Sequence, residues 1–267
     1  MMKMKFQMSK ILAVAALLTG IIVFEMACQK DDTTDQPTLT LRLTDGPASY
    51  QAVNIDIIGA EVHVNKDVNS ANGWQPLNIQ TGIFNILSLN NGLDTLLGST
   101  PLPVGDISEI RLKLGTNNTV KVNGSTYPLS IPSGGESGLK LKFEKKLVAG
   151  VSYEVFLDFD AAKSIKEKNR TTYELKPVLR LFTSATSGSV RGTVTPVSCR
   201  AVVYALRGVD TITSAFPVAS TGKFVLMGLD AGTYTIAVNS DSCLNKTLNN
   251  ITVETGKAND VGTVQLR

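Results

Sequence analysis

Apolar and polar residues alternate along most of the chain after its first 37 residues. Leu39, Leu41 and Leu43 are separated by polar residues, and the same spacing recurs in 110–114 and 139–143. A period of two sends alternate side chains to opposite faces of a strand, so each segment is expected to have one buried and one wet face. The pattern therefore predicts an all-β chain.

Two irregular positions and one short segment refine this picture. Between residues 53 and 64 the apolar positions shift from odd to even numbers at Gly59, which predicts a β-bulge there. Asn123 and Gly124 lie between two alternating segments and predict a tight hairpin turn. The one helix that the pattern favours is short, over residues 161–168.

The N-terminal segment has the layout of a secretory signal. Three lysines precede an apolar run of 14 residues, Ile11–Phe24, and the small residue Ala27 stands before Cys28. A helix that spans a bilayer needs about 20 apolar residues, so a permanent transmembrane segment is the weaker interpretation. Residues 1–27 are therefore predicted to be a signal peptide.

The residues around Cys28 resemble the cleavage site of bacterial lipoproteins. Met26-Ala27-Cys28 is similar to the end of a lipobox, in which the cysteine is acylated, although Glu25 departs from the usual aliphatic residue. Gln29–Asp32 resembles the acidic tag of Bacteroidetes lipoproteins that are sent to the outer face of the outer membrane. The resemblance implies an N-terminal lipid such as palmitate on Cys28, membrane attachment and display on the cell surface. Residues 28–37 would form a polar lipidated linker, and a plain solvated linker is the alternative for the tag.

Charge and cysteine content narrow the classes of partner and compartment. Residues 1–27 carry three lysines and one glutamate, so their removal lowers the formal net charge from +3 to +1. A nearly neutral chain without a basic stripe is not expected to bind nucleic acid. With Cys28 assigned to lipid, Cys199 and Cys243 remain as a pair in an oxidising compartment. They are predicted to form a disulfide, with two buried free thiols as the alternative.

The chain divides at a small, polar segment, 184–189, which is predicted to link two strand-rich parts. In the second part, residues 190–267, the run Gly228–Val238 reads G-L-x-x-G-x-Y-x-I and resembles the carboxypeptidase regulatory-like domain. That family is a small transthyretin-like β-sandwich without the peptidase itself.

The first part, residues 38–183, resembles the domain of unknown function numbered 4382. The resemblance rests on stretches in matching order, among them Leu43–Pro47, Ile110–Leu114, Leu157–Ala161 and Leu175–Arg180. The two resemblances together imply two immunoglobulin-like or transthyretin-like β-sandwich domains in tandem after a lipidated flexible tether. The numbered family has no established activity, so the resemblance implies architecture rather than chemistry.

Catalytic chemistry has few candidates in this sequence. His63 is the only histidine and shares a strand face with Glu61, so any Ser-His-Asp or Cys-His arrangement would have to use it, and we favour an exposed histidine of a sheet over a general base. A zinc site of the carboxypeptidase kind needs paired histidines, which one histidine cannot supply. No G-x-S-x-G motif occurs. We expect no enzymatic activity, no cofactor and no metal ion.

Three aspartates form the strongest polar cluster that the sequence suggests. Asp158 and Asp160 are two apart on a strand and point to the same face, and Asp45 follows the first strand. One interpretation is a cation site or an acid–base pair. The interpretation that we favour is structural, with Asp160 as the N-cap of the short helix.

Ligand contact has one further candidate residue and one candidate loop. Trp74, the sole tryptophan, could stack on a sugar from a loop or fill the core at the start of a strand. The glycine-rich segment 132–138 is either a cover for a ligand or a long hairpin connection. The sequence thus favours a non-enzymatic binding or adhesion module for a glycan, a peptide or an envelope protein, with a structural subunit of an envelope assembly as the alternative.

Overall fold

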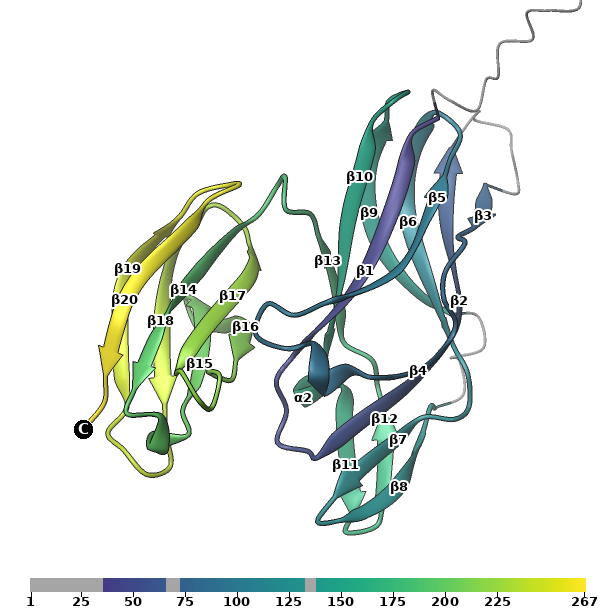
Figure 1. Ribbon diagram of the computed structural model, residues 1–267. Helices are drawn as coiled ribbons and strands as arrows, with labels where there is room; N and C mark the ends of the chain where they lie inside the picture. The colour runs from purple at the N-terminus through teal and green to yellow at the C-terminus, as the bar shows by residue number, and fades with distance from the viewer. Residues whose placement is uncertain (1–35, 66–72, 133–137) are drawn as a thin grey trace, which may run out of the picture. The chain divides into compact units, whose positions relative to one another are not determined.

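The computed structural model describes residues 36–65, 73–132 and 138–267 (Figure 1). The predicted signal peptide, Cys28 and nearly all of the predicted tether lie outside the described residues, as do residues 133–137 of the predicted glycine-rich loop. Among the described residues, no helix is long and apolar enough to cross a membrane.

The described part of the chain is nearly all β and forms two β-sandwiches, as predicted. The first sandwich contains β1 (Thr38–Gly46), β2 (Ala52–Asn65), β3 (Trp74–Pro76), β4 (Gly82–Asn85), η2 (Ile86–Leu89), β5 (Thr95–Pro101), β6 (Gly105–Leu114), β7 (Thr119–Val122), β8 (Ser125–Ser130), β9 (Leu139–Leu147), β10 (Ser152–Asp160), α2 (Ala161–Ser164), β11 (Ile165–Asn169), β12 (Thr172–Leu175) and β13 (Leu179–Phe182). The second contains β14 (Gly188–Thr195), η4 (Val197–Cys199), β15 (Val202–Arg207), β16 (Asp210–Ala215), β17 (Lys223–Leu229), β18 (Gly232–Asn239), β19 (Lys246–Val253) and β20 (Ala258–Gln265).

The first sandwich packs a four-stranded sheet against a larger one. The smaller sheet has the order β13-β10-β1-β5, and β1 and β10 run parallel. The larger sheet has the order β11-β12-β8-β7-β2-β6-β9, with β3 and β4 also paired to β2. The alternating apolar residues of both sheets, such as Leu41, Leu43, Ile55, Leu112 and Leu157, are at most 1% exposed and form one core.

The second sandwich has its own apolar core. Its sheets have the orders β17-β14-β20 and β16-β15-β18-β19. Val190, Phe224, Ile236 and Val238 are at most 1% exposed and belong to one cluster that contains no residue of the first sandwich. Each sheet therefore buries one face, which is what the period-two pattern requires.

Two local predictions are confirmed, and the predicted helix is shorter than expected. The register of β2 against β6 shifts between Ile57 and Gly59, which is the predicted bulge. Asn123 and Gly124 join β7 to β8 with φ of 48° and 83°, as a two-residue hairpin with left-handed turn residues requires. The helix predicted over 161–168 ends at Ser164.

The helix stops there because the chain re-enters a sheet. Ile165 pairs with Leu175 of β12 and is buried, so the following residues gain strand pairing and burial that a longer helix would lose. The predicted linker, 184–189, is also shorter than expected, because Gly188 and Ser189 already belong to β14. Ser187 is buried and its hydroxyl donates to the carbonyl of Thr183, so this segment forms a hydrogen-bonded turn.

Candidate functional site

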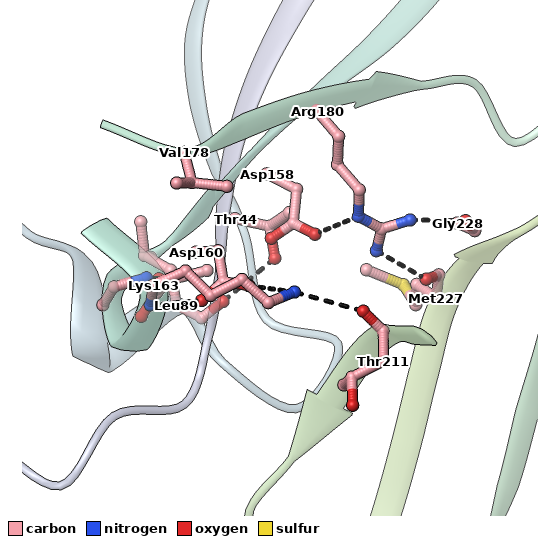
Figure 2. Close-up of polar contacts among 12 residues, drawn as sticks. Thr44, Leu89, Asp158, Asp160, Lys163, Val178, Arg180, Thr211, Met227 and Gly228 are labelled. Atoms are coloured by element: carbon pink, nitrogen blue, oxygen red, sulfur yellow. Dashed lines mark hydrogen bonds and ion pairs between the residues drawn. The ribbon is translucent and has the colours of Figure 1, made fainter. Parts of the chain in front are cut away.

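The three candidate aspartates lie together because β1 and β10 are parallel neighbours that end at the same place. Asp45 is paired with Phe159, so it lies between Asp158 and Asp160 in the register. Asp158 and Asp160 lie at the carboxyl end of β10, next to the start of α2 (Figure 2), and Asp45 lies at the carboxyl end of the parallel strand β1. The structure thus brings together the residues that the sequence suggested as a cluster.

Two of these carboxylates hold the first turn of α2. The side chain of Asp160 is the N-cap and accepts a hydrogen bond from the backbone N–H of Lys163 at 2.9 Å. Asp45 Oδ1 accepts from the backbone N–H of Ala161 at 3.0 Å. Backbone N–H groups at the start of a helix have no partner within the helix, so these contacts satisfy two groups that would otherwise be unpaired.

The third carboxylate, Asp158, forms an ion pair with Arg180 across two antiparallel strands. Asp158 is directly opposite Arg180 in the register of β10 and β13, and Nε of Arg180 lies 2.6 Å from Asp158 Oδ2. The side chain of Asp158 is only 8% exposed, whereas that of Arg180 is 29% exposed. The ion pair is therefore mostly shielded from water. An unpaired carboxylate in such a shielded position would be energetically costly.

Burial raises the pKa of Asp45 well above its ordinary value, and the nearby charges of Asp158 and Asp160 raise it further. The hydrogen bond from Ala161 lowers the pKa of Asp45 but does not outweigh burial. Oδ2 of Asp45 is buried and has no hydrogen-bond partner among the residues that the structure describes. Raised pKa values occur at catalytic carboxyls, but structural clusters of like charges produce the same shift.

The space around the cluster is small. Two hollows of about 20 and 60 Å³ are both lined by Asp158 and Arg180, and the smaller one has room for about one water molecule. Within residues 36–65, 73–132 and 138–267, no group of three or more His, Cys, Asp or Glu side chains is arranged to hold a metal ion. The guanidinium of Arg180 would also repel a cation at this position.

Arg180 additionally connects the first sandwich to the second. Figure 2 shows its guanidinium between Asp158 on one side and the backbone of β17 on the other. It donates to the carbonyl of Gly228 at 2.5 Å and to the carbonyl of Met227 at 3.0 Å. Lys163 of α2 donates from Nζ to the carbonyl of Thr211 in β16 at 3.1 Å. The cluster is therefore part of a junction between the sandwiches.

Asn91 extends this junction along β17. Its Oδ1 accepts from the backbone N–H of Val225 at 2.7 Å, and its Nδ2 donates to the carbonyl of Lys223 at 3.2 Å. The side-chain amide of Asn91 thus forms two hydrogen bonds with the backbone of β17, one accepted and one donated, as the backbone of a neighbouring strand would. Since β17 is an edge strand, these contacts satisfy backbone groups that another chain could otherwise pair with.

Sequence reasoning missed the role of Asn91. The available signal was the dipeptide Asn91-Gly92, which is typical of a turn that needs left-handed backbone, and the two residues have φ of 58° and 82°. The turn itself could be predicted from that signal. The strand that it contacts lies more than 130 residues later in the chain, and no local pattern indicates it.

Trp74 lies on a strand rather than in a loop. It belongs to β3, pairs with His63 of β2, and contacts the His63 ring edge-on with the ring centroids 5.2 Å apart. The guanidinium of Arg111 lies 3.8 Å from the centre of the indole ring. Arg111 and Lys113 both form ion pairs with Glu61, so the tryptophan is part of a polar outer face of the sheet.

Cys199 and Cys243 are joined in the structure as a disulfide, as the cysteine count predicted. The bond connects η4 with the turn between β18 and β19, 44 residues later. The β18–β19 connection is thereby tied to η4.

The fold defines an all-β protein built from tandem sandwiches. Residues 36–177 match the family described as Domain of unknown function (DUF4382), and the chain belongs to this family. No curated protein matches the chain.

Solved structures with some similarity come from several bacteria. They include a cohesin–X-dockerin complex from Acetivibrio cellulolyticus (20% identity over 30% of this chain and 56% of that chain, TM-score 0.25). A candidate cell adhesion protein from Bacteroides fragilis is 15% identical over 56% of this chain and 45% of that chain, with a TM-score of 0.25. A fimbrial protein from Bacteroides ovatus is 11% identical over 87% of this chain and 50% of that chain, with a TM-score of 0.26. The chain spans about half the length of each of these three structures.

Proposed function

We propose that the chain is a non-enzymatic binding module that is displayed on a bacterial cell surface and recognises an envelope protein or a glycan. The observation that carries this proposal is the use of the aspartate cluster. Asp45 and Asp160 hold the first turn of α2, and Asp158 is paired with Arg180. The most plausible catalytic or cation-binding group of the sequence is thus engaged in internal contacts that connect the two sandwiches.

The test of this proposal compares a carboxylate variant with a surface variant. Asp158→Asn keeps the side chain's shape and removes its charge, and Asp230→Asn is a matched change at an exposed position of the second sandwich. Purified protein with each change is used to capture partners from envelope extracts and is applied to a glycan array. We expect partner capture to survive Asp230→Asn, and we expect no hydrolytic activity on the captured partner from any variant. Turnover that Asp158→Asn abolishes while folding is retained would contradict the proposal.

Attachment through Cys28 is part of the same proposal. The lysines, the apolar run and the cysteine at residues 1–28 support lipidation, and the Gln29–Asp32 tag supports outward display at the outer membrane. Metabolic labelling with a palmitate analogue should mark the wild type and should fail for Cys28→Ser. Protease added to intact cells should remove the wild-type protein. Release of unlabelled wild-type protein into the medium would contradict the anchor.

A structural role in an envelope assembly is the second candidate, and the junction is the observation that favours it. Side chains of the first sandwich satisfy backbone groups along the edge strand β17, which suits a protein that must keep a fixed shape within an assembly. A structural subunit should co-purify with a fixed partner in constant stoichiometry. A binding module should instead be saturated by a free ligand.

A further inference from the structure

The second sandwich contains an apolar hollow that none of the contacts described above uses. It has a volume of about 300 Å³ and lies between the end of β14, η4 and the connection from β16 to β17. Its walls include Val194, Val197, Phe216, Pro217 and Val218. This volume is at the lower end of the range for small-molecule and side-chain binding pockets.

Among the described residues that line this hollow, Arg200 alone is charged. It is exposed, and its side chain forms no ion pair or hydrogen bond with any residue in the described part of the chain. By contrast, Arg191 of the same sandwich is paired with Asp260 at 3.2 Å. The hollow therefore combines an apolar wall with a cation whose charge is available to a ligand.

The backbone of Arg200 is held in place by several contacts. Its φ of 48° and ψ of 47° are left-handed, which is uncommon for a residue other than glycine or asparagine. The preceding residue, Cys199, is tied to Cys243 by the disulfide, and its carbonyl accepts hydrogen bonds from the hydroxyls of Ser240 at 2.6 Å and Ser242 at 3.2 Å. The backbone from which the side chain of Arg200 extends is therefore held at a fixed position beside the hollow.

We propose that the hollow binds the C-terminal aliphatic residue of a partner peptide, with the side chain in the hollow and the α-carboxylate on Arg200. The inference rests on the proposed binding function and names the chemistry of the partner. Arg200 and the apolar residues Val197 and Ala201 all line the hollow, so the cation borders its apolar wall. In a C-terminal leucine or valine the carboxylate and the apolar side chain are attached to one Cα, so such a residue offers an anion and an apolar group side by side.

The openness of the hollow favours a peptide over a free acyl chain. Val197 and Val218 are 45% and 43% exposed, so a long acyl chain would leave much of its surface in water. A peptide end needs to bury only one side chain and can continue into solvent. A carboxylate that pairs with a guanidinium in two parallel hydrogen bonds adds affinity and orientation.

The test measures binding of a fluorescein-labelled Gly-Ser-Gly-Leu peptide to the purified full chain by fluorescence anisotropy. The peptide is used with a free C-terminus and as the C-terminal amide, and octanoate is added as a competitor. We expect the free acid to bind about tenfold more tightly than the amide, because the amide loses the charge-assisted hydrogen bonds. Arg200→Asn, which tolerates left-handed backbone, should remove this preference, and Arg200→Lys should restore part of it.

The controls separate this inference from the broader proposal. Arg191→Gln changes an arginine outside the hollow and should leave the preference intact, whereas Val218→Ser should weaken binding of both peptides. Equal affinity for acid and amide, no binding up to about 1 mM peptide, or complete displacement by octanoate at a lower concentration than unlabelled peptide would overturn the inference. If the wild type and Arg200→Asn capture an envelope partner equally, the hollow does not bind that partner, but the proposed binding function is still supported. If no variant captures any partner, the binding function itself fails.

Discussion

Replacing Arg180 by alanine removes the side chain that contacts both sandwiches at once. The change breaks the ion pair with Asp158 and two hydrogen bonds to the carbonyls of Met227 and Gly228. The carboxylate of Asp158 stays in place, because its strand is central to the four-stranded sheet. The variant therefore leaves a charged group without its cation at a position that is 8% exposed.

The expected loss of stability follows from this burial. Removing one partner of a buried ion pair costs about 3–5 kcal/mol, because the remaining charge is not compensated. Since the side chain of Arg180 is 29% exposed, water screens part of the interaction, and we expect the lower end, about 3 kcal/mol. Arg191→Ala is the matched control. Its pair with Asp260 is more than half exposed on both sides, so its loss should cost at most about 1 kcal/mol.

Urea unfolding measures both effects with two signals. Trp74 is the sole tryptophan and lies in the first sandwich, whereas far-ultraviolet circular dichroism reports the strands of both. For Arg180→Ala we expect a lower midpoint and a dichroism transition that no longer coincides with the fluorescence transition, because the sandwiches lose a connection. When Asp158 is already replaced by alanine, Arg180→Ala should lower the free energy of unfolding by at least about 1 kcal/mol less than it does in the wild type. If Arg180→Ala loses no more stability than Arg191→Ala, the reasoning about the junction is refuted.

Three further predictions concern other parts of the molecule. Because burial raises the pKa of Asp45 in the folded protein, its stabilising contribution is complete below its unfolded pKa of 3.8 and is lost as the pH rises through the folded pKa. Asp45→Asn keeps an oxygen acceptor and should thus have a higher urea midpoint than the wild type at neutral pH. The difference between the two midpoints should shrink as the pH falls toward 3.8. A difference that stays constant across this range would contradict the burial argument. Reduction of the Cys199–Cys243 disulfide, which spans 44 residues, should lower the free energy of unfolding by about 4 kcal/mol in a Cys28→Ser background, and a loss below about 1 kcal/mol would contradict this estimate. Arg111→Ala uncovers the indole ring of Trp74 and should shift its emission to longer wavelength with a loss of about 1 kcal/mol, so an unchanged spectrum would count against the stacked arrangement.

The sequence predicted the regular parts of the fold because one-sided burial leaves a local signal. The alternation in 39–43 and 110–114 is the core face of β1 and β6. The bulge at Gly59 and the turn at Asn123-Gly124 also have local signatures, and both are present. The extent of α2 was overestimated, because pairing of the residues after Ser164 with β12 depends on contacts that are not local.

The sequence indicated which residues form the candidate site, but it did not indicate what those residues contact. Asp158 and Asp160 share a strand face, and that spacing indicated the cluster. The parallel pairing that places Asp45 between them joins residues more than 100 positions apart, so the sequence could only suggest it. The contact of Arg180 with the carbonyls of β17 depends on how the sandwiches meet, and a backbone carbonyl carries no sequence signal at all.

The central claim is that the polar groups at the ends of β1 and β10 serve the junction with β17 rather than catalysis or cation binding. Hydrogen–deuterium exchange of the Val225 backbone amide tests it most directly, because this amide of the edge strand β17 donates its hydrogen bond to Oδ1 of Asn91. We expect the amide to be protected in the wild type, to the same degree with and without added calcium, and to exchange faster in Asn91→Ala and Arg180→Ala. Rapid exchange in the wild type, or protection that appears only when calcium is added, would contradict the account.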